Sequence, residues 1–326
     1  MEMRNIHKIA VLGGGTMGPG IAQTFAQYNY DVKLWSRKEE TIDRARRVIR
    51  TNLSTFAAHD LLRDEDIEPA MGRITFTTAI ESAVEGADLI VETIIENHDE
   101  KKKLFHRLDK VCPEDAILTS NTSTLNIYEV VPEARLPSTV IAHWFAPPHI
   151  LPLVEVVRGI ETSDNTVNRV LDLLKKVGKI PVVMEKFIPG FAINRILRAL
   201  GRETFFLLDN GYMTADQLDL AVKASIAPRM MFLGLVQRYD FTGLDLSAGN
   251  LQSKAFIDPP IDNEPKSLFE LVAKGDMGVK TGKGFFDYTD KPLEETLKER
   301  DDYLIRVLKG TDFCLKSSIG KRKEEN

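Results

Sequence analysis

The sequence has few cysteines and no long apolar run, and because its first eight residues contain no apolar segment we expect no secretory signal. Two cysteines, Cys112 and Cys314, are too few for a disulfide framework or a cysteine-based metal cluster, and we expect no metal site. Two free thiols are typical of a reducing compartment, so we expect a cytoplasmic protein. No apolar run approaches the ~20 residues of a membrane-spanning helix, and we therefore expect no membrane partner.

A surplus of positive charge is also lacking. The 326 residues include 43 Lys and Arg against 48 Asp and Glu, which gives a net charge of −5 at pH 7. Nucleic-acid-binding proteins present a basic surface, so we expect no nucleic acid partner. Hydrophobic residues make up 43% of the chain, as in globular proteins, and the length favours two domains.

The first half alternates short apolar runs with helical patterns. Strands are predicted at residues 9–12, 32–35, 89–91, 117–119, 140–145, 153–157 and 180–184. Helices are predicted between them, and residues 39–70 indicate two helices with a break near His59 and Asp60. This alternation predicts an α/β domain over residues 1–187, with a mostly parallel, doubly wound sheet and an inserted helical pair.

Strand signals nearly vanish after Gly190. Apolar residues recur at helical spacing over residues 191–208, and Gly211 follows as a typical helix end. Thr214 begins a capping box that opens the next helix, and another amphipathic helix is predicted at about residues 293–308. The second half therefore predicts an all-α domain over residues 188–326.

A glycine-rich segment, Gly13-Gly-Gly-Thr-Met-Gly18, follows the first predicted strand and opens a helix. In a G-x-G-x-x-G pattern the glycines permit a tight turn, close approach to a pyrophosphate and close helix–strand packing, while the helix start offers free N–H groups. We predict a Rossmann-type dinucleotide site that includes Gly13, Gly15, Thr16, Met17 and Gly18. The alternative is a glycine turn with a structural role only.

The end of the second predicted strand indicates which dinucleotide binds. A carboxylate for the ribose is expected about 20 residues after the glycines, but Ser36, Arg37 and Lys38 occupy this place, before Glu39. A serine hydroxyl and an arginine suit a 2′-phosphate, so the prediction is NAD(P) with a preference for NADP. The alternative is that Arg37 and Lys38 form a solvated turn.

Two residues at the next strands suggest acid–base chemistry. His143 ends one predicted strand and Glu155 lies in the following one. A histidine is a suitable proton acceptor for the oxidation of an alcohol, and a carboxylate beside its second ring nitrogen fixes the tautomer. The structural alternative is a histidine that only packs in the core. His149, beside two prolines, is predicted to be a loop residue.

Five segments together resemble the L-3-hydroxyacyl-CoA dehydrogenase family, which includes 3-hydroxybutyryl-CoA dehydrogenases. They are Gly13–Ala22, Ser120–Thr124, His143–Glu155, Pro189–Arg195 and Gly278–Phe285, and the resemblance extends to about Tyr288. Relatives of this family include gulonate, carnitine and pyridine-alcohol dehydrogenases and lambda-crystallin. The resemblance implies a Rossmann-type domain followed by a helical domain that forms a dimer and closes the substrate cleft.

The resemblance implies roles for four catalytic residues. His143 matches the family's catalytic base and Glu155 its partner carboxylate. Ser123 matches a serine near the substrate oxygen and nicotinamide, and Asn194 matches an asparagine that polarises the substrate carbonyl. The structural alternatives are that Ser123 caps a helix beginning near Leu125 and that Asn194 is a polar residue of an early helical turn.

Three further residues match family positions near the cofactor. Glu96 and Lys101 lie around the start of a predicted helix, and Lys280 lies in the Gly278 loop. The structural alternatives are an exposed helix face for Glu96 and Lys101 and an ordinary turn for Lys280.

Two departures from the family pattern bear on the substrate. Ala146 occupies the place of an asparagine three residues after the catalytic histidine, and alanine cannot make that hydrogen bond. The paired-helix segment, which in the family carries Lys- and Gly-rich residues toward CoA phosphates, contains Asn52–Leu62 instead. The nearby arginines, Arg46, Arg47 and Arg50, are either anion contacts or a solvated helix face. The chain also extends past Tyr288, as in relatives that act on free hydroxy acids.

Three functional hypotheses follow, and the first two are enzymes that act on a small-molecule substrate. The first is NAD(P)-dependent oxidation of an L-3-hydroxyacyl-CoA to the 3-oxoacyl-CoA, a reaction of fatty acid metabolism. The second is a dehydrogenase of a free small 3-hydroxy acid or alcohol. The third is a crystallin-like structural protein that binds the cofactor without turnover. In each case the resemblance predicts a homodimer.

Overall fold

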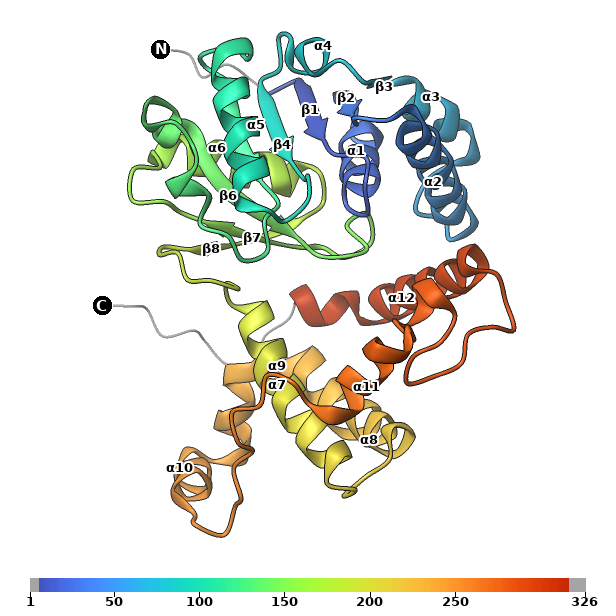
Figure 1. Cartoon of the computed structure of the whole chain (residues 1–326), viewed down its shortest axis with the longest axis vertical. Helices are drawn as coiled ribbons and strands as arrows, with labels where there is room; N and C mark the ends of the chain where they lie inside the picture. The colour runs from blue at the N-terminus through green and yellow to red at the C-terminus, as the bar shows by residue number, and fades with distance from the viewer. Residues whose placement is uncertain (1–5, 317–326) are drawn as a thin grey trace. The chain divides into compact units, whose positions relative to one another are not determined.

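Eight strands form one sheet in the first part of the chain, and the computed structural model describes residues 6–316 (Figure 1). The strands are β1 (Lys8–Leu12), β2 (Asp31–Trp35), β3 (Ile74–Thr77), β4 (Leu89–Glu92), β5 (Ile117–Ser120), β6 (Thr139–Trp144), β7 (Leu153–Val157) and β8 (Ile180–Met184). Their order is β3-β2-β1-β4-β5-β6-β7-β8, and every neighbouring pair is parallel except β6 and β7. The predicted α/β sheet is therefore confirmed.

Helices cover both faces of this sheet. One core joins the sheet to α1 (Gly18–Gln27), α2 (Glu39–Ala58), α3 (Ile67–Gly72) and α6 (Asp164–Lys176). The opposite core joins it to α4 (Ile80–Val84) and α5 (His98–Val111). In β1, Ile9 and Val11 face the first core while Ala10 and Leu12 face the second, because side chains alternate along a strand.

The inserted helical pair is present, and one strand was not predicted. α2 ends at Ala58, Asp60 takes a left-handed conformation with φ of 56°, and a short 3₁₀ turn, η1 (Asp64–Asp66), leads into α3. The unpredicted strand is β3, which has four residues at the edge of the sheet and is buried fully only at Ile74. So short a run, half exposed, carries little periodic signal.

The second part of the chain is helical, as predicted. Its elements are α7 (Ile193–Asp209), α8 (Ala215–Ala221), the π-helical turn η4 (Val222–Ile226), α9 (Ala227–Thr242), α10 (Leu244–Gln252), α11 (Lys266–Lys274), the 3₁₀ turn η5 (Val279–Thr281) and α12 (Leu293–Lys316). Gly211 follows α7 with φ of 68°, and the Thr214 side chain caps α8 by accepting from the Gln217 N–H. Helix α12 is eight residues longer than predicted.

The structure divides into two compact units, Met1–Arg195 and Ile196–Asn326. The predicted boundary near residue 187 lies in the segment between β8 and α7. Across the residues that the structure describes, no helix is both long and apolar enough to span a bilayer.

Candidate active site

The glycine loop joins the carboxyl end of β1 to α1. Gly13 has φ of 135°, and a Cβ on it would lie 2.4 Å from the carbonyl oxygen of Thr93. A Cβ on Gly18 would lie 1.7 Å from the Gly13 carbonyl oxygen. Both positions therefore exclude any side chain, and they let the loop turn tightly into α1 beside the end of β4.

Gly15 differs from these two glycines because the protein does not fill the space around it. No atom lies within 4 Å of where its Cβ would be, and Gly15 and Thr16 are exposed at the start of α1. Met17 is half-buried and precedes the helix. An open backbone cradle at a helix N-terminus suits a pyrophosphate, so the residues present fit a dinucleotide.

Ser36 and Arg37 follow β2 at the same edge of the sheet. Ser36 is buried, and its Cβ lies 3.1 Å from the ideal Cβ position of Gly14. The Arg37 side chain is 68% exposed and lies 3.7 Å from a carboxylate oxygen of Glu100. The guanidinium is therefore accessible and only loosely paired.

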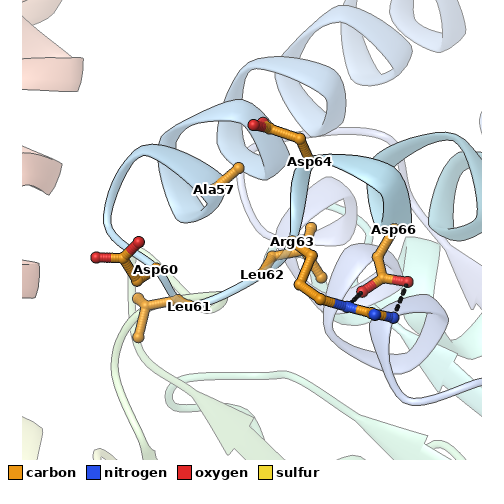
Figure 2. Close-up of a pocket in the computed structure, with 7 residues that line it drawn as sticks. All are labelled: Ala57, Asp60, Leu61, Leu62, Arg63, Asp64 and Asp66. Carbon is orange, nitrogen blue, oxygen red and sulfur yellow. Dashed lines mark hydrogen bonds and ion pairs between the residues drawn. The ribbon is translucent and has the colours of Figure 1, made fainter.

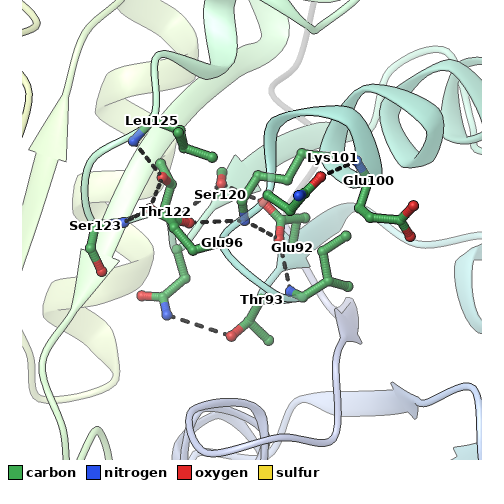
Figure 3. A network of polar contacts seen from close by, with 12 residues as sticks. Glu92, Thr93, Glu96, Glu100, Lys101, Ser120, Thr122, Ser123 and Leu125 are labelled. Carbon is green, nitrogen blue, oxygen red and sulfur yellow. Dashed lines mark hydrogen bonds and ion pairs between the residues drawn. The ribbon is translucent and has the colours of Figure 1, made fainter. Parts of the chain in front are cut away.

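Glu96 organises the loop after β5 through one oxygen atom. Its Oε1 accepts from the Thr122 hydroxyl at 2.7 Å and from the backbone N–H groups of Ser123 and Thr124 at 2.8 and 3.0 Å (Figure 3). Burial would raise the pKa of Glu96, but these hydrogen bonds and the Lys101 charge outweigh it and lower the pKa. Glu96 therefore stays ionised and precedes α5 rather than lying on its exposed face.

Beneath Glu96 lies a buried ion pair that the sequence did not indicate. Lys101 is 1% exposed, and its Nζ lies 2.6 Å from Oε1 of Glu92, which is 0% exposed. The Ser120 hydroxyl donates to the other Glu92 oxygen, and Lys101 also lies 3.5 Å from Glu96 (Figure 3). The exposed-face interpretation of Lys101 is therefore wrong. At 1% exposure Lys101 offers a cofactor almost no surface of its own, and its partner nearest the surface is Glu96.

His143 and Glu155 stand opposite each other on the antiparallel strands β6 and β7. The distance from His143 Nδ1 to Glu155 Oε2 is 2.9 Å, and both side chains are buried. Since strand neighbours in register share a face of the sheet, the local pairing alone brings the two groups together. The contact leaves Nε2 as the ring nitrogen able to exchange a proton with a ligand.

The second oxygen of Glu155 is held at the start of α7. Oε1 accepts from the backbone N–H groups of Ala192 and Ile193, both at 3.0 Å. Burial would raise the pKa of Glu155, but the hydrogen bonds from His143, Ile193 and Ala192 outweigh it and lower the pKa. The carboxylate is therefore charged beside the imidazole, at the positive end of a helix.

Aromatic rings enclose the imidazole. The ring centroids of Phe145 and Phe191 lie 4.5 and 5.3 Å from that of His143. The side chain of Asn121, a residue that was not predicted as part of the site, accepts from the Trp144 N–H at 2.8 Å. This hydrogen bond joins the end of β5 to the end of β6. These contacts restrict His143 to one orientation at the carboxyl edge of β6.

The remaining predicted residues lie in different surroundings. Ser123 is half-buried in the loop held by Glu96. The short 3₁₀ turn that follows, η2 (Ile127–Glu129), begins after Asn126 and has no side-chain cap, so the capping interpretation of Ser123 is wrong. Asn194 is half-buried on the first turn of α7. Lys280 lies on η5, in the second unit. His149 is a loop residue, as predicted.

The turn between α2 and α3 forms a pocket with an acidic lining (Figure 2). It is lined by Ala57, Asp60, Leu61, Leu62, Arg63, Asp64 and Asp66. Arg63 is engaged by Asp66 at 2.7 Å and by Glu65. Of the nearby arginines, Arg46 lies 4.2 Å above the Phe76 ring and Arg50 pairs with Glu68, so two of the three are already engaged.

Two family models match the chain over most of its length. The first, "3-hydroxyacyl-CoA dehydrogenase, NAD binding domain", matches residues 8–187. The second, "3-hydroxyacyl-CoA dehydrogenase, C-terminal domain", matches residues 190–288 and so ends before α12.

Curated relatives and solved structures agree with these models. The chain is 31% identical to 5-formyl-3-hydroxy-2-methylpyridine 4-carboxylate 5-dehydrogenase of Mesorhizobium japonicum, over 94% of this chain and 100% of the relative. It is 35% identical to 3-hydroxybutyryl-CoA dehydrogenase of Clostridioides difficile, over 86% of this chain and 99% of that one. Among solved structures, the chain is similar to a crystal structure of a 5-formyl-3-hydroxy-2-methylpyridine 4-carboxylic acid 5-dehydrogenase, which is described as an NAD⁺-dependent dismutase. The TM-score is 0.84 and the identity is 30%, over 94% of this chain and 99% of that chain. The chain therefore belongs to the 3-hydroxyacyl-CoA dehydrogenase family of NAD-dependent oxidoreductases.

Proposed function

We propose that this chain oxidises a hydroxyl group of a small molecule, and reduces the corresponding carbonyl in reverse, with His143 as the acid–base group. The observation that carries the proposal is the His143–Glu155 contact of 2.9 Å, with Glu155 held by two backbone N–H groups. A nicotinamide cofactor held by the Gly13–Gly18 loop would supply the hydride acceptor for this oxidation. Nε2 of His143 takes the hydroxyl proton, so a carbonyl forms and the imidazole becomes an imidazolium.

Two nearby polar groups are proposed to stabilise the charge that develops on the substrate oxygen. The Asn194 side-chain amide lies at the start of α7, directly after Ala192 and Ile193, whose backbone N–H groups hold Glu155. The Ser123 hydroxyl lies in the loop held by Glu96. Hydrogen-bond donors that are held in place before the reaction stabilise an alkoxide more than flexible ones do.

Replacement of the histidine tests this function. His143→Gln should lower kcat by roughly 10²–10⁴-fold, because the amide cannot take the proton, while cofactor affinity stays unchanged. The matched control is His106→Gln on the exposed side of α5. Turnover by His143→Gln at the rate of the wild type would overturn the role.

We further propose that the substrate carries no CoA. The turn between α2 and α3 presents Asp60 and Asp64 beside the Arg63–Asp66 ion pair, and unpaired carboxylates repel the phosphates of CoA. Ala146 removes an amide from the loop beside His143. A relative that matches nearly the whole chain is named for a pyridine carboxylate. The alternatives are an acyl-CoA substrate, as other relatives' names say, and a cofactor-binding protein without turnover.

For the cofactor we propose NADP over NAD. No carboxylate lies between the end of β2 and Glu39, and Arg37 is accessible for pairing with a 2′-phosphate. The kcat/KM values for the two cofactors test this, and Arg37→Ala should reduce the NADP value more than the NAD value. A strong NAD preference of the wild type would contradict the proposal.

We also propose a homodimer formed by the second unit. Helices α7 to α11 contain no buried residue, although many of their side chains are apolar. Val236 on α9 and Leu251 on α10 are 80% and 85% exposed. So much exposed apolar surface favours binding to another protein. The family resemblance implies that this partner is a second copy of the chain.

A further inference from the structure

Lys179 is a buried lysine between α6 and β8 that has no part in the proton transfer. It is 7% exposed. Its Nζ donates to the carbonyl oxygens of Pro148 at 2.7 Å and Leu151 at 2.9 Å, and lies 5.3 Å from the centroid of the Trp144 ring. All three partners lie in or next to the segment that follows His143.

The two carbonyls belong to the loop that joins β6 to β7, residues 145–152. This loop connects the strand of His143 to the strand of Glu155. Within it, the N–H groups of Ile150 and Leu151 both donate to the Pro147 carbonyl, and prolines have no N–H to offer. Lys179 therefore supplies donors that the loop itself lacks.

The other side of the loop contacts helices α1 and α2, next to the glycine loop. A Cβ on Gly20 of α1 would lie 2.8 Å from Pro148 Cγ and 3.1 Å from Nδ1 of His149. The His149 ring also lies 5.6 Å from the Phe56 ring on α2. The loop is thus packed between Lys179 on one side and α1 and α2 on the other.

The Lys179 ammonium is buried, and it has no ionic partner in the part of the chain that the structure describes. Among residues 6–316 no carboxylate pairs with it, and the groups that face its Nζ are the two carbonyls of the loop and the Trp144 ring of β6. Burial accordingly lowers the pKa of Lys179 to about 7. A buried ammonium is costly, so its hydrogen bonds are the strong, charge-assisted kind only while it is protonated.

We propose that Lys179 is a positioning residue that holds the β6–β7 loop against α1 and so fixes His143 relative to the dinucleotide site. The proposal rests on the proposed role of His143. It assigns Lys179 no contact with substrate or cofactor.

Hydrogen exchange and kinetics of Lys179→Met test this role. Exchange at the Ile150 and Leu151 amides should quicken at least tenfold, and kcat/KM should fall about tenfold, while the β1 amides keep their protection. The matched control is Lys176→Met, which removes an exposed lysine from the end of α6. Exchange at Ile150 and Leu151 equal to that of the control would overturn the proposal. Hydrogen exchange can be measured without turnover, so the positioning role of Lys179 is tested independently of the proposed role of His143.

The wild-type chain provides a second measurement if Lys179→Met does not fold. Exchange at Ile150 and Leu151, corrected for its intrinsic pH dependence, should quicken from pH 6 to pH 9 as Lys179 loses its proton. A neutral amine retains two N–H donors but not the charge. Protection of both amides that is independent of pH over this range would contradict the proposal.

Discussion

Glu155 joins groups that are distant along the chain. One oxygen contacts His143, twelve residues earlier, and the other accepts from Ala192 and Ile193, 37 and 38 residues later. The carboxylate thereby fixes the imidazole ring and the first turn of α7 together. A charged acceptor gives shorter and stronger hydrogen bonds than a neutral one, so its charge matters for both contacts.

Glu155→Gln should destabilise the protein at neutral pH by about 1–2 kcal/mol, because the amide retains an acceptor oxygen but loses the charge. The pKa of Glu155 is lowered in the folded state, so its stabilisation is present above the usual glutamate pKa and lost as pH falls through the folded value. The difference between variant and wild type, measured by urea unfolding, should therefore shrink below about pH 4.

The control for this variant is Glu185→Gln, because Glu185 is an exposed glutamate that follows β8. A destabilisation by Glu155→Gln that stays constant from pH 7 to pH 3 would contradict the account of the carboxylate.

Among individual residues, the sequence best predicts those that lie on neighbouring strands. The sequence places His143 and Glu155 on two consecutive strands and the family resemblance implies their roles, while the register that sets them opposite each other is seen only in the structure. The amides of Ala192 and Ile193 were not predicted, because every residue has an N–H and only the tertiary fold selects two of them. Lys179 gave no signal either, since lysine is normally exposed and its burial depends on the β6–β7 loop.

Two glycines of the loop between β1 and α1 should respond differently to substitution by alanine. Gly18→Ala should impair both stability and cofactor binding, because its Cβ would overlap the Gly13 carbonyl. Gly15→Ala should leave the melting temperature nearly unchanged but reduce cofactor affinity tenfold or more, because its methyl group would enter only the space left for the pyrophosphate. Calorimetric titration and thermal unfolding measure the two effects. Equal cofactor affinity for Gly15→Ala and wild type would exclude this cradle.

The β4–α5 element depends on its buried ion pair. Glu92→Gln should cost about 3 kcal/mol of unfolding free energy, because it leaves the buried Lys101 ammonium with only the more distant Glu96 carboxylate, at 3.5 Å. Addition of Lys101→Met should recover part of the loss. The control is Glu81→Gln, which breaks the exposed pair with Arg107 and should change little. Similar losses for Glu92→Gln and Glu81→Gln would contradict the role of burial.

Among helices, strands and loops, most of the correct predictions came from strong hydrophobic periodicity and from glycine patterns. The glycine loop, the helical pair and the Thr214 cap follow from local sequence, and the structure has them where they were expected. The edge strand β3 and the burial of Lys101 did not follow. Lys101 has polar neighbours in sequence, and only Glu92, nine residues earlier on a buried strand, accounts for its place.

Across the whole molecule, the exposed apolar side chains of the second unit predict self-association. Sedimentation equilibrium should give twice the chain mass. Val236→Glu should shift the equilibrium toward the monomer, while Ile160→Lys, at an exposed apolar residue of the first unit, should not. A wild-type monomer at micromolar concentration would contradict the proposed homodimer.

The direct test of the central claim is turnover by the whole enzyme on substrates with and without CoA. Initial rates are measured with NADPH and NADH, using acetoacetyl-CoA and a panel of free 3-oxo acids and pyridine aldehydes. The account predicts that kcat/KM for at least one free substrate exceeds the value for acetoacetyl-CoA tenfold or more, and that His143→Gln abolishes this turnover. A preference for acetoacetyl-CoA, or cofactor binding without turnover of any substrate, would contradict it.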